Sequence, residues 1–212
     1  MGRAASKKSS DWKDGFLFLG NELALDFVNT RPVQDGQATE LLPDFKAVLR
    51  WFLAAHLLTP QQTRSLQQHW ENSPQTRQTV EALRALREEL RREILAWEAG
   101  GKPHQTTVAD LNRLMAQHPM RTRVRTAGKR LTTELYFEPQ QPEDLFAPLA
   151  HSAAELFADV DPGRVRKCAH CVLHFHDTSK KGTRRWCSMQ LCGNRDKVAT
   201  YAARQRRRAR KS

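Results

Sequence analysis

Apolar residues recur at helical spacing along most of residues 15–160. In the stretch 43–58 they form one stripe, and in the stretch 74–99 they keep a three-and-four-residue rhythm until a glycine pair ends it. Both stretches are predicted to be amphipathic helices with one buried face. Shorter helices are predicted at 21–28, 59–72 and 108–117, and after the proline at 142 as far as residue 160.

Residues with short polar side chains precede several of these helices. The segment Thr59–Gln62 has the sequence of a capping box, with proline at the first helical position. Ser73 stands before another proline and repeats this arrangement. Asn21 and Thr107 are predicted to cap the helices that follow them, because a side-chain oxygen at this position accepts a hydrogen bond from a free backbone N–H.

The pattern changes to strict alternation after the helix at 108–117. Arg121, Arg123 and Arg125 alternate with threonine and valine, a turn sequence follows at 127–129, and the alternation then resumes. We predict a β-hairpin, so the fold class of this region is mainly α with a β-hairpin, or α+β. The three arginines share a strand face that suits an acidic effector or DNA, but a solvated strand face is the simpler interpretation.

The 212-residue chain is long enough for one or two domains with buried cores. Its longest uncharged stretch, 51–63, is too short and too polar to span a bilayer, which predicts no membrane partner. The first residues are basic but are followed by Asp11 and Asp14 instead of an apolar run, so they do not resemble a secretory signal. We expect residues 1–14 to be disordered and the protein to be cytoplasmic.

Charge divides the chain more sharply than hydropathy does. The net charge is +12, yet residues 1–160 hold 20 basic and 20 acidic side chains, whereas residues 161–212 hold 15 basic and three acidic ones. The turn sequence at 161–163 marks the change. We therefore predict two domains, 15–160 and 161–212, and the whole positive excess lies in the second.

All four cysteines also lie in the basic domain, as two close pairs. Cys168 and Cys171 form the first pair, Cys187 and Cys192 form the second, and fifteen residues separate the pairs. In a reducing compartment such pairs favour metal binding over disulfides. Four thiolates complete the tetrahedral shell of one structural Zn²⁺, which supplies on the order of 10 kcal/mol of folding free energy to a domain with few large apolar residues.

Two alternatives to this ligand set stay open at the level of sequence. The cysteines would otherwise be free or partly redox-active thiols. His170, His174 and His176 stand beside the first pair, so one of them could replace a cysteine as a ligand. A catalytic zinc would need an open coordination position, which four cysteines do not leave.

The sequence after the last cysteine is rich in alanine and arginine and contains no helix breaker. We predict a helix that is capped by Asn194 and runs to about Arg210. A cysteine pair at a helix start favours a treble-clef-like finger, in which a knuckle and a hairpin precede a helix. The second domain is therefore predicted to be a treble-clef-like zinc finger that ends in a basic helix.

The residues around the second cysteine pair resemble the CGNR zinc finger, which is named for the tetrapeptide that begins at Cys192. Upstream, residues 19–20 and the segment Leu23–Thr30 resemble the opening of the ABATE domain, which accompanies this finger in a family of bacterial stress-induced transcription regulators. The resemblance implies that the four cysteines bind zinc and that the finger binds nucleic acid. The residues that carry the resemblance to the finger are Phe175, Asp177, Ser179, Gly182, Arg184, Arg185, Trp186, Cys187, Met189, Cys192, Gly193, Asn194, Arg195 and Lys197.

The leading hypothesis is a DNA-binding transcriptional regulator, in which the finger contacts DNA and residues 15–160 sense a signal or dimerise. A helix of about 16 residues fits the major groove, and arginines contact phosphates or guanine there. The candidate nucleic-acid-binding residues are basic side chains near the zinc site and along the predicted helix: Arg184, Arg185, Arg195, Lys197, Arg204, Arg207, Arg208 and Lys211.

Two other functions use parts of the same pattern. RNA or ribosome binding needs the same charges, but the sequence lacks the run of Phe and Tyr on which single-stranded RNA readers stack bases. An enzyme with an accessory finger is disfavoured, because no nucleophile–base motif, phosphate loop or HExxH motif occurs. The expected partners are therefore duplex DNA, a second copy of the chain in a homodimer, and a small-molecule effector.

Overall fold

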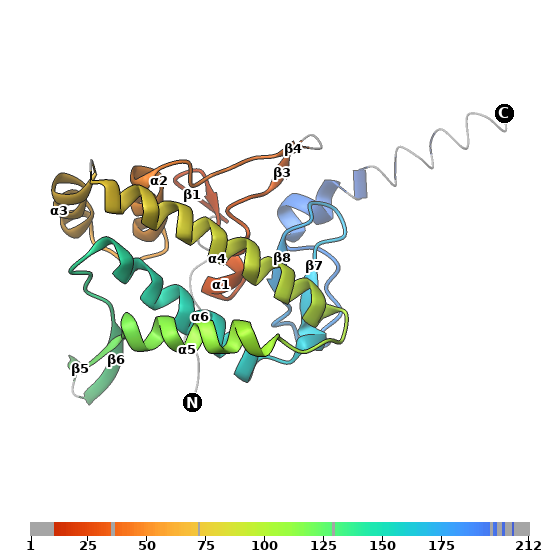
Figure 1. Ribbon diagram of the computed structural model, residues 1–212. Helices are drawn as coiled ribbons and strands as arrows, with labels where there is room; N and C mark the ends of the chain where they lie inside the picture. The colour runs from red at the N-terminus through yellow and green to blue at the C-terminus, as the bar shows by residue number, and fades with distance from the viewer. Residues whose placement is uncertain are drawn as a thin grey trace.

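The computed structural model describes residues 11–34, 37–71, 73–128, 130–195, 197, 198, 201 and 205. Over this part of the chain the fold is α+β, with helices surrounding a central short helix and with small two-stranded hairpins (Figure 1). The α-helices are α1 (Leu23–Val28), α2 (Phe45–Ala54), α3 (Pro60–Trp70), α4 (Pro74–Glu98), α5 (Gln105–Gln117) and α6 (Phe146–Asp159). The antiparallel strand pairs are β1 (Trp12–Lys13) with β2 (Phe16–Leu17), β3 (Val33–Gln34) with β4 (Gln37–Ala38), β5 (Arg121–Ala127) with β6 (Arg130–Tyr136), and β7 (Val165–Lys167) with β8 (His174–His176).

Helix α1 lies at the centre of the hydrophobic core. Leu25, Phe27 and Val28 are completely buried, and α1 packs against α4, α6 and β8 (Figure 1). A helix this short has too few hydrogen bonds to be stable alone, so burial of its apolar surface on every side holds it in place. Because β8 belongs to the cysteine-rich region, the central helix also joins the two halves of the chain.

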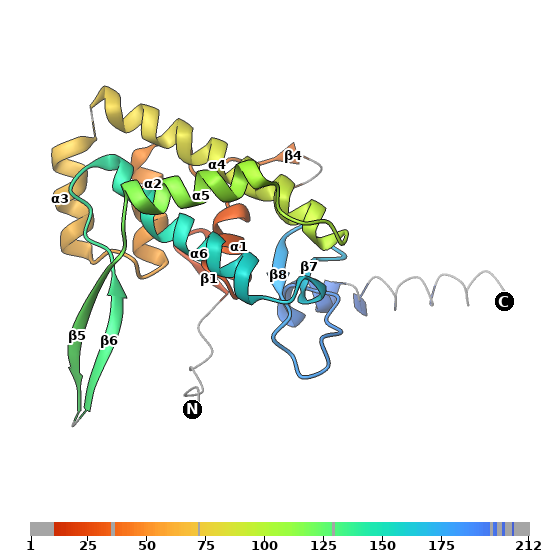
Figure 2. The same ribbon diagram turned by 60° about the horizontal axis from the view of Figure 1, so that its bottom comes forward.

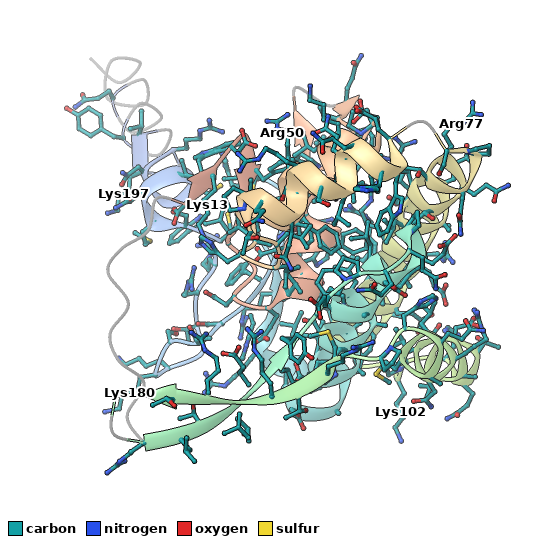
Figure 3. The ribbon with its side chains drawn as sticks, turned by 90° about the vertical axis from the view of Figure 1, so that its left-hand side faces the viewer. Lys13, Arg50, Arg77, Lys102, Lys180 and Lys197 are labelled. Carbon is teal, nitrogen blue, oxygen red and sulfur yellow. The ribbon has the colours of Figure 1, made fainter. Side chains whose placement is uncertain are left out.

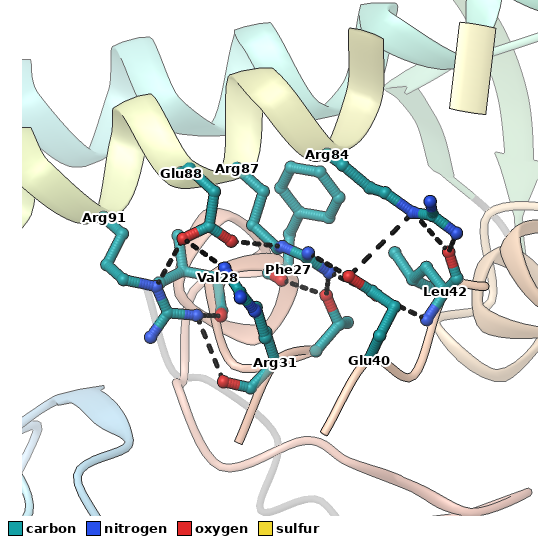
Figure 4. Close-up of polar contacts among 10 residues, drawn as sticks. Phe27, Val28, Arg31, Glu40, Leu42, Arg84, Arg87, Glu88 and Arg91 are labelled. Carbon is teal, nitrogen blue, oxygen red and sulfur yellow. Dashed lines mark hydrogen bonds and ion pairs between the residues drawn. The ribbon is translucent and has the colours of Figure 1, made fainter. Parts of the chain in front are cut away.

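A buried arginine fixes the segment that follows α1 (Figure 4). Arg87 of α4 is 1% exposed, and its guanidinium pairs with Glu40 and donates to the Thr30 hydroxyl at 3.0 Å. On either side of it, Arg84 donates to the carbonyl of Leu42 and Arg91 to the carbonyl of Val28. A buried guanidinium is tolerated when its charge is paired and its donors are bonded, and this network therefore pins the chain between α1 and α2 against α4.

Several helix starts follow the sequence signals, but the predicted caps at Asn21, Thr107 and Asn194 do not form. The capping box is confirmed at Thr59, and α4 spans almost the whole predicted stretch. Asn21 is not a cap, because its φ of +63° and its hydrogen bond to the carbonyl of His176 place it outside α1. Helix α5 starts at Gln105, and the Thr107 hydroxyl donates to Glu89 instead of capping.

The N-terminal segment is ordered from Asp11 onward, so the expectation of disorder through residue 14 is wrong for residues 11–14. Trp12 and Lys13 pair with β2, and Asp14 forms a two-pronged ion pair with Arg50 of α2. Residues 1–10 lie outside the described residues. The local order follows from these tertiary contacts and leaves no trace in the hydrophobic pattern.

The predicted hairpin is confirmed as β5–β6, a ribbon with seven cross-strand pairs that projects from the helical body (Figure 2). Phe137, immediately after β6, is buried and packs against Phe52 of α2 at 5.9 Å between ring centroids, which anchors the base of the ribbon. Among the described helices, none is long and apolar enough to cross a membrane. The predicted boundary at 161–163 coincides with a short 3-10 turn (Pro162–Arg164) that leads into β7.

Candidate metal centre and nucleic-acid interface

The first cysteine pair lies on the tight connection between β7 and β8. The backbone N–H of Cys168 donates to the carbonyl of Leu173 at 2.8 Å, which closes the connection into a knuckle. Val172 has a φ of +58°, a left-handed conformation that turns the chain into β8. The knuckle therefore directs the sulfur atoms of Cys168 and Cys171, three positions apart in the sequence, to one side of the hairpin.

The second cysteine pair lies at the start of a helical segment. The Ser188 hydroxyl accepts from the N–H of Leu191, and the Ser188 carbonyl accepts from Cys192 and Gly193. The turn Met189–Gly193 places Cys187 before its first residue and Cys192 inside it. Helical backbone continues at the described positions 194, 195, 197, 198, 201 and 205, so the prediction that Asn194 caps this helix is wrong. Ser188 holds the cap position, and the Asn194 side chain donates to the carbonyl of Gln190. A knuckle on a hairpin followed by a helix is the predicted treble-clef-like arrangement.

The four sulfur atoms have the geometry of a tetrahedral metal site. All four lie within 4.8 Å of one another, with 3.4 Å between Cys171 and Cys187 and 3.7 Å between Cys187 and Cys192. Zn–S bonds of about 2.3 Å in a tetrahedron require sulfur atoms roughly 3.8 Å apart, so the cluster fits Zn²⁺. Burial raises the pKa of the Cys192 thiol to about 12, so a metal cation is what makes its thiolate stable at neutral pH.

The neighbouring histidines are engaged elsewhere. His174 and His176 of β8 direct their Nδ1 atoms towards the helical body, where each lies 2.8 Å from a carboxylate, of Glu98 and Glu22 respectively. His170 is exposed. The ligand cluster therefore consists of the four cysteines, and the alternative of a histidine ligand is not needed.

Hydrogen bonds of Asp177 and Arg164 hold the loop between the cysteine pairs. Asp177 is completely buried and accepts hydrogen bonds from the backbone N–H groups of Ser179 and Arg184. Desolvation acts to raise the pKa of Asp177, but the hydrogen bonds from Ser179 and Arg184 outweigh it and hold the pKa below its ordinary value. Arg164 donates to the carbonyls of Asp177 and Ser179, which closes the loop from the other side.

The finger is docked on the helical body by backbone-directed hydrogen bonds. The Asn29 side chain donates to the carbonyl of His174 at 2.8 Å and accepts from its N–H at 2.9 Å. Two residues along, the N–H of His176 donates to the carbonyl of Gly20 and its carbonyl accepts from Asn21. One edge of β8 is therefore paired by the segment around α1, as a neighbouring strand would pair it.

The segment from Gly20 to Asn29 contacts β8 and is called the docking segment below, and Gly20 and Asp26 shape it. A Cβ on Gly20 would lie 2.7 Å from the Cβ of Leu25 and 2.8 Å from the N of Asp26, so only glycine fits here. The Gly20 N–H donates to the Asp26 carboxylate at 2.7 Å. Burial raises the pKa of Asp26 to about 7, against the opposing effect of hydrogen bonds from Gly20 and Leu19.

Of the eight predicted nucleic-acid-binding residues, one belongs to the framework of the finger, three are exposed and four lie outside the described residues. Arg184 is half-buried, donates to the carbonyl of Cys187 and lies 4.9 Å from the Phe175 ring centroid, so it is part of the finger's own framework. Arg185, Arg195 and Lys197 are exposed. The remaining candidates, Arg204, Arg207, Arg208 and Lys211, lie outside the described residues.

Comparison with known families assigns both halves of the chain. Residues 21–160 match the ABATE family, which is described as "Putative stress-induced transcription regulator". The chain belongs to the ABATE family. Residues 164–205 match the CGNR zinc finger, so this ABATE protein binds one structural Zn²⁺ in its four-cysteine cluster. Among curated proteins, none matches the chain.

The ABATE match begins at Asn21 and so includes most of the docking segment. The sequence resemblance drew attention to Asp26 and Asn29 but did not say what they do. The structure shows that Asn29 bonds the finger and that Asp26 supports the turn at Gly20. No local sequence signal indicates such a role, because the partners Asn29 and His174 are 145 positions apart.

Proposed function

We propose that the protein is a transcriptional regulator that binds duplex DNA through its CGNR finger, while the ABATE region senses a signal or dimerises. The observation that supports this most strongly is the exposure of Arg185, Arg195 and Lys197 on a module held rigid by zinc. A scaffold that is already ordered loses little backbone conformational freedom when its exposed cations meet a phosphate backbone. One family description names a transcription regulator and the other names a zinc finger, and neither names an enzyme.

The basic residues of the finger divide into two groups. Arg164, Arg166 and Arg184 donate to carbonyls inside the finger, so they maintain its loops. Arg195 and Lys197 instead lie on the helical segment that follows the zinc ligand Cys192. An α-helix fits the major groove, so the exposed group is the one that we assign to DNA.

The test is a titration of a labelled duplex of mixed sequence by the zinc-loaded full-length protein at several salt concentrations. We expect Arg195→Gln together with Lys197→Gln to lower the slope of log K against log salt by about 2, because each lost phosphate contact contributes roughly 0.9. The matched control is Arg77→Gln with Lys102→Gln, which removes the same charge from the opposite side of the molecule (Figure 3). Equal slopes for the two double variants would contradict the proposal.

A duplex RNA of the same sequence tests the second function. Preferential binding of RNA in competition would favour the RNA- or ribosome-binding alternative, which uses the same exposed charges. Absence of salt-dependent binding to either duplex would contradict both nucleic-acid functions. The homodimer and the small-molecule effector stay predictions, and the structure offers the effector a groove of about 870 Å³ lined by Leu53, Leu57, Met120 and Tyr136.

A further inference from the structure

The β5–β6 hairpin presents two chemically different faces. The register pairs Arg121 with Tyr136, Arg123 with Glu134 and Ala127 with Arg130. Directly paired residues lie on the same face of a ribbon, so four arginines share one face with Glu134 and Tyr136. Threonine, valine and leucine residues occupy the other face.

The arginine face is organised although it is exposed. Arg123 and Arg125 both pair with Glu134, and the guanidinium of Arg123 lies 4.6 Å from the Tyr136 ring centroid. One carboxylate thus orients two guanidinium groups and neutralises only one charge. The neighbouring Arg121 and Arg130 extend the same face towards the base and the tip of the ribbon.

The ribbon contributes little to the core of the protein. Every residue of β5 is exposed, and Val124 and Leu131 on the opposite face are 63% and 73% exposed. A two-stranded ribbon is only marginally stable by itself, so the exposed part of β5–β6 adds little to the free energy of unfolding. Its anchor is the buried Phe137 at the base.

Positive charge within the ABATE region is concentrated on this ribbon. Residues 121–136 contain five basic side chains and one acidic side chain, whereas residues 1–160 as a whole are neutral. The rest of that region is therefore net negative, which makes its contact with a polyanion electrostatically unfavourable. The ribbon is the part of the region whose charge suits such a contact.

The ribbon and the finger lie at opposite ends of the helical body and extend towards the same side of it (Figure 2). In Figure 2 the ribbon and the loop that follows β8 extend in the same direction. In Figure 3 the tip of the ribbon lies on the side of Lys180 and Lys197, whereas Arg77 and Lys102 lie on the opposite side. A rigid duplex that contacts the finger on this side can therefore also reach the ribbon.

We propose that the arginine face of β5–β6 is a second DNA-binding element, which contacts the phosphate backbone of the duplex held by the finger. This inference rests on the proposed function of the finger. A two-stranded ribbon fits a DNA groove, and arginines on its face can contact the phosphates at the groove edges. The ABATE region would thereby take part in DNA binding directly, in addition to any sensing role.

The test uses three double variants of the zinc-loaded full-length protein in the same duplex titration. Arg121→Gln with Arg130→Gln removes two charges from the ribbon and keeps the cluster of Arg123, Glu134 and Tyr136 intact. We expect this variant to lose about fivefold to tenfold in affinity per charge at 100 mM salt, and to lower the salt slope by about 2. The finger variant described above and the control with changes at Arg77 and Lys102 complete the set.

The outcomes separate the ribbon from the finger. If the ribbon variant binds with the control's affinity and slope while the finger variant is impaired, the second element is refuted and the proposed function stands. If the wild-type protein binds no duplex, both are refuted. Unchanged thermal unfolding of the ribbon variant shows that its weaker binding is not caused by misfolding.

Other occupants of the ribbon give different results. If the loss of affinity is found with duplex RNA and not with duplex DNA, the ribbon binds RNA and the DNA inference is wrong. If Val124→Thr with Leu131→Thr dissociates a dimer in analytical ultracentrifugation while the arginine variant binds DNA normally, the ribbon is a contact between copies of the chain. That result also overturns the inference.

Discussion

Two antiparallel hairpins of this protein both carry basic residues but have opposite surroundings. β7 contains Arg166 and Lys167, whereas β5 alternates arginine with threonine or valine. Phe175 at the centre of β8 is completely buried, whereas Val124 at the centre of β5 is 63% exposed. The difference lies in what each hairpin meets, because β8 is paired along its edge by Asn29 and Gly20. No element gives β5–β6 comparable cover among the described residues.

This comparison shows that the basic residues of the finger and of the ribbon are not equivalent. In the docked finger, Arg164 and Arg184 bond backbone carbonyls and hold loops in place. In the free ribbon, Arg121 and Arg130 lie on an exposed face. The number of arginines does not reveal this difference, whereas hydrogen bonding separates framework residues from residues able to bind a partner.

The largest expected effect is loss of Zn²⁺ from the four-cysteine site beside β7–β8. Cys187→Ser leaves three thiolates, so the finger should lose Zn²⁺ and with it folding free energy on the order of 10 kcal/mol. Metal analysis together with circular dichroism of the purified variant measures this loss. His170→Ala, an exposed change beside the knuckle, is the control and should keep one zinc per chain. A Cys187→Ser protein with full zinc content would contradict the four-cysteine site.

The second effect is a pH dependence that originates at Asp26. Its pKa of about 7 in the folded protein lies above the ordinary value of 3.8, so the folded state binds this proton more tightly. The stability from this group is complete below about pH 4 and is lost as the pH rises through 7. Between pH 5 and pH 8 we expect the free energy of unfolding of the wild-type protein to fall by roughly 2–3 kcal/mol more than that of the Asp26→Asn variant.

Urea unfolding at both pH values measures this difference. Asp26→Asn keeps an oxygen that accepts from Gly20 but does not ionise, so its stability should change less with pH. Lys13 and Glu22 are the charged groups whose fields act on Asp26, in opposite directions. Parallel pH profiles for the two proteins would show that Asp26 does not stay protonated in the fold.

The third effect tests how β8 is held. Asn29→Ala leaves the buried N–H and C=O of His174 without their partner, which should lower the free energy of unfolding by about 2–4 kcal/mol. Hydrogen exchange of the His174 amide, measured together with urea unfolding, should show faster exchange in the variant. Asn21→Gly is the milder comparison, because glycine accepts the φ of +63° and only the exposed bond to His176 is lost, so the free energy of unfolding should fall by about 1 kcal/mol or less. Equal costs at the two positions would argue against a specific role for Asn29.

The smallest effect is expected in the free ribbon. Leu131→Thr changes a side chain that is 73% exposed, so the free energy of unfolding should stay within about 0.5 kcal/mol of the wild-type value. Thermal unfolding at two protein concentrations measures it. A large, concentration-dependent loss of stability would mean that the ribbon is covered by another copy of the chain, and the contrast between the two hairpins would disappear.

The elements that sequence reasoning predicted well are those with local causes. The rhythm of apolar residues in α4, the capping box at Thr59 and the alternation in β5–β6 each act over a few neighbouring residues. The cysteine spacing and the CGNR tetrapeptide likewise predicted the zinc site before any geometry was known. The wrong caps at Asn21 and Thr107 concern side chains whose hydrogen bonds go to distant residues instead of to the adjacent helix. Asn194 is not a cap because the helical backbone already begins after Ser188.

By itself the amino-acid sequence indicated most of the helices, the β5–β6 hairpin, the basic region 161–212 and the four zinc ligands, because periodicity, charge and ligand spacing are properties of short segments. Only the tertiary structure decided which basic residues are free. Asn29 meets His174 and Arg87 meets Glu40 through contacts between distant parts of the chain, and burial makes each of them sensitive to its partner. The side of the molecule that both the ribbon and the finger face is set in the same way, by packing of whole elements around α1.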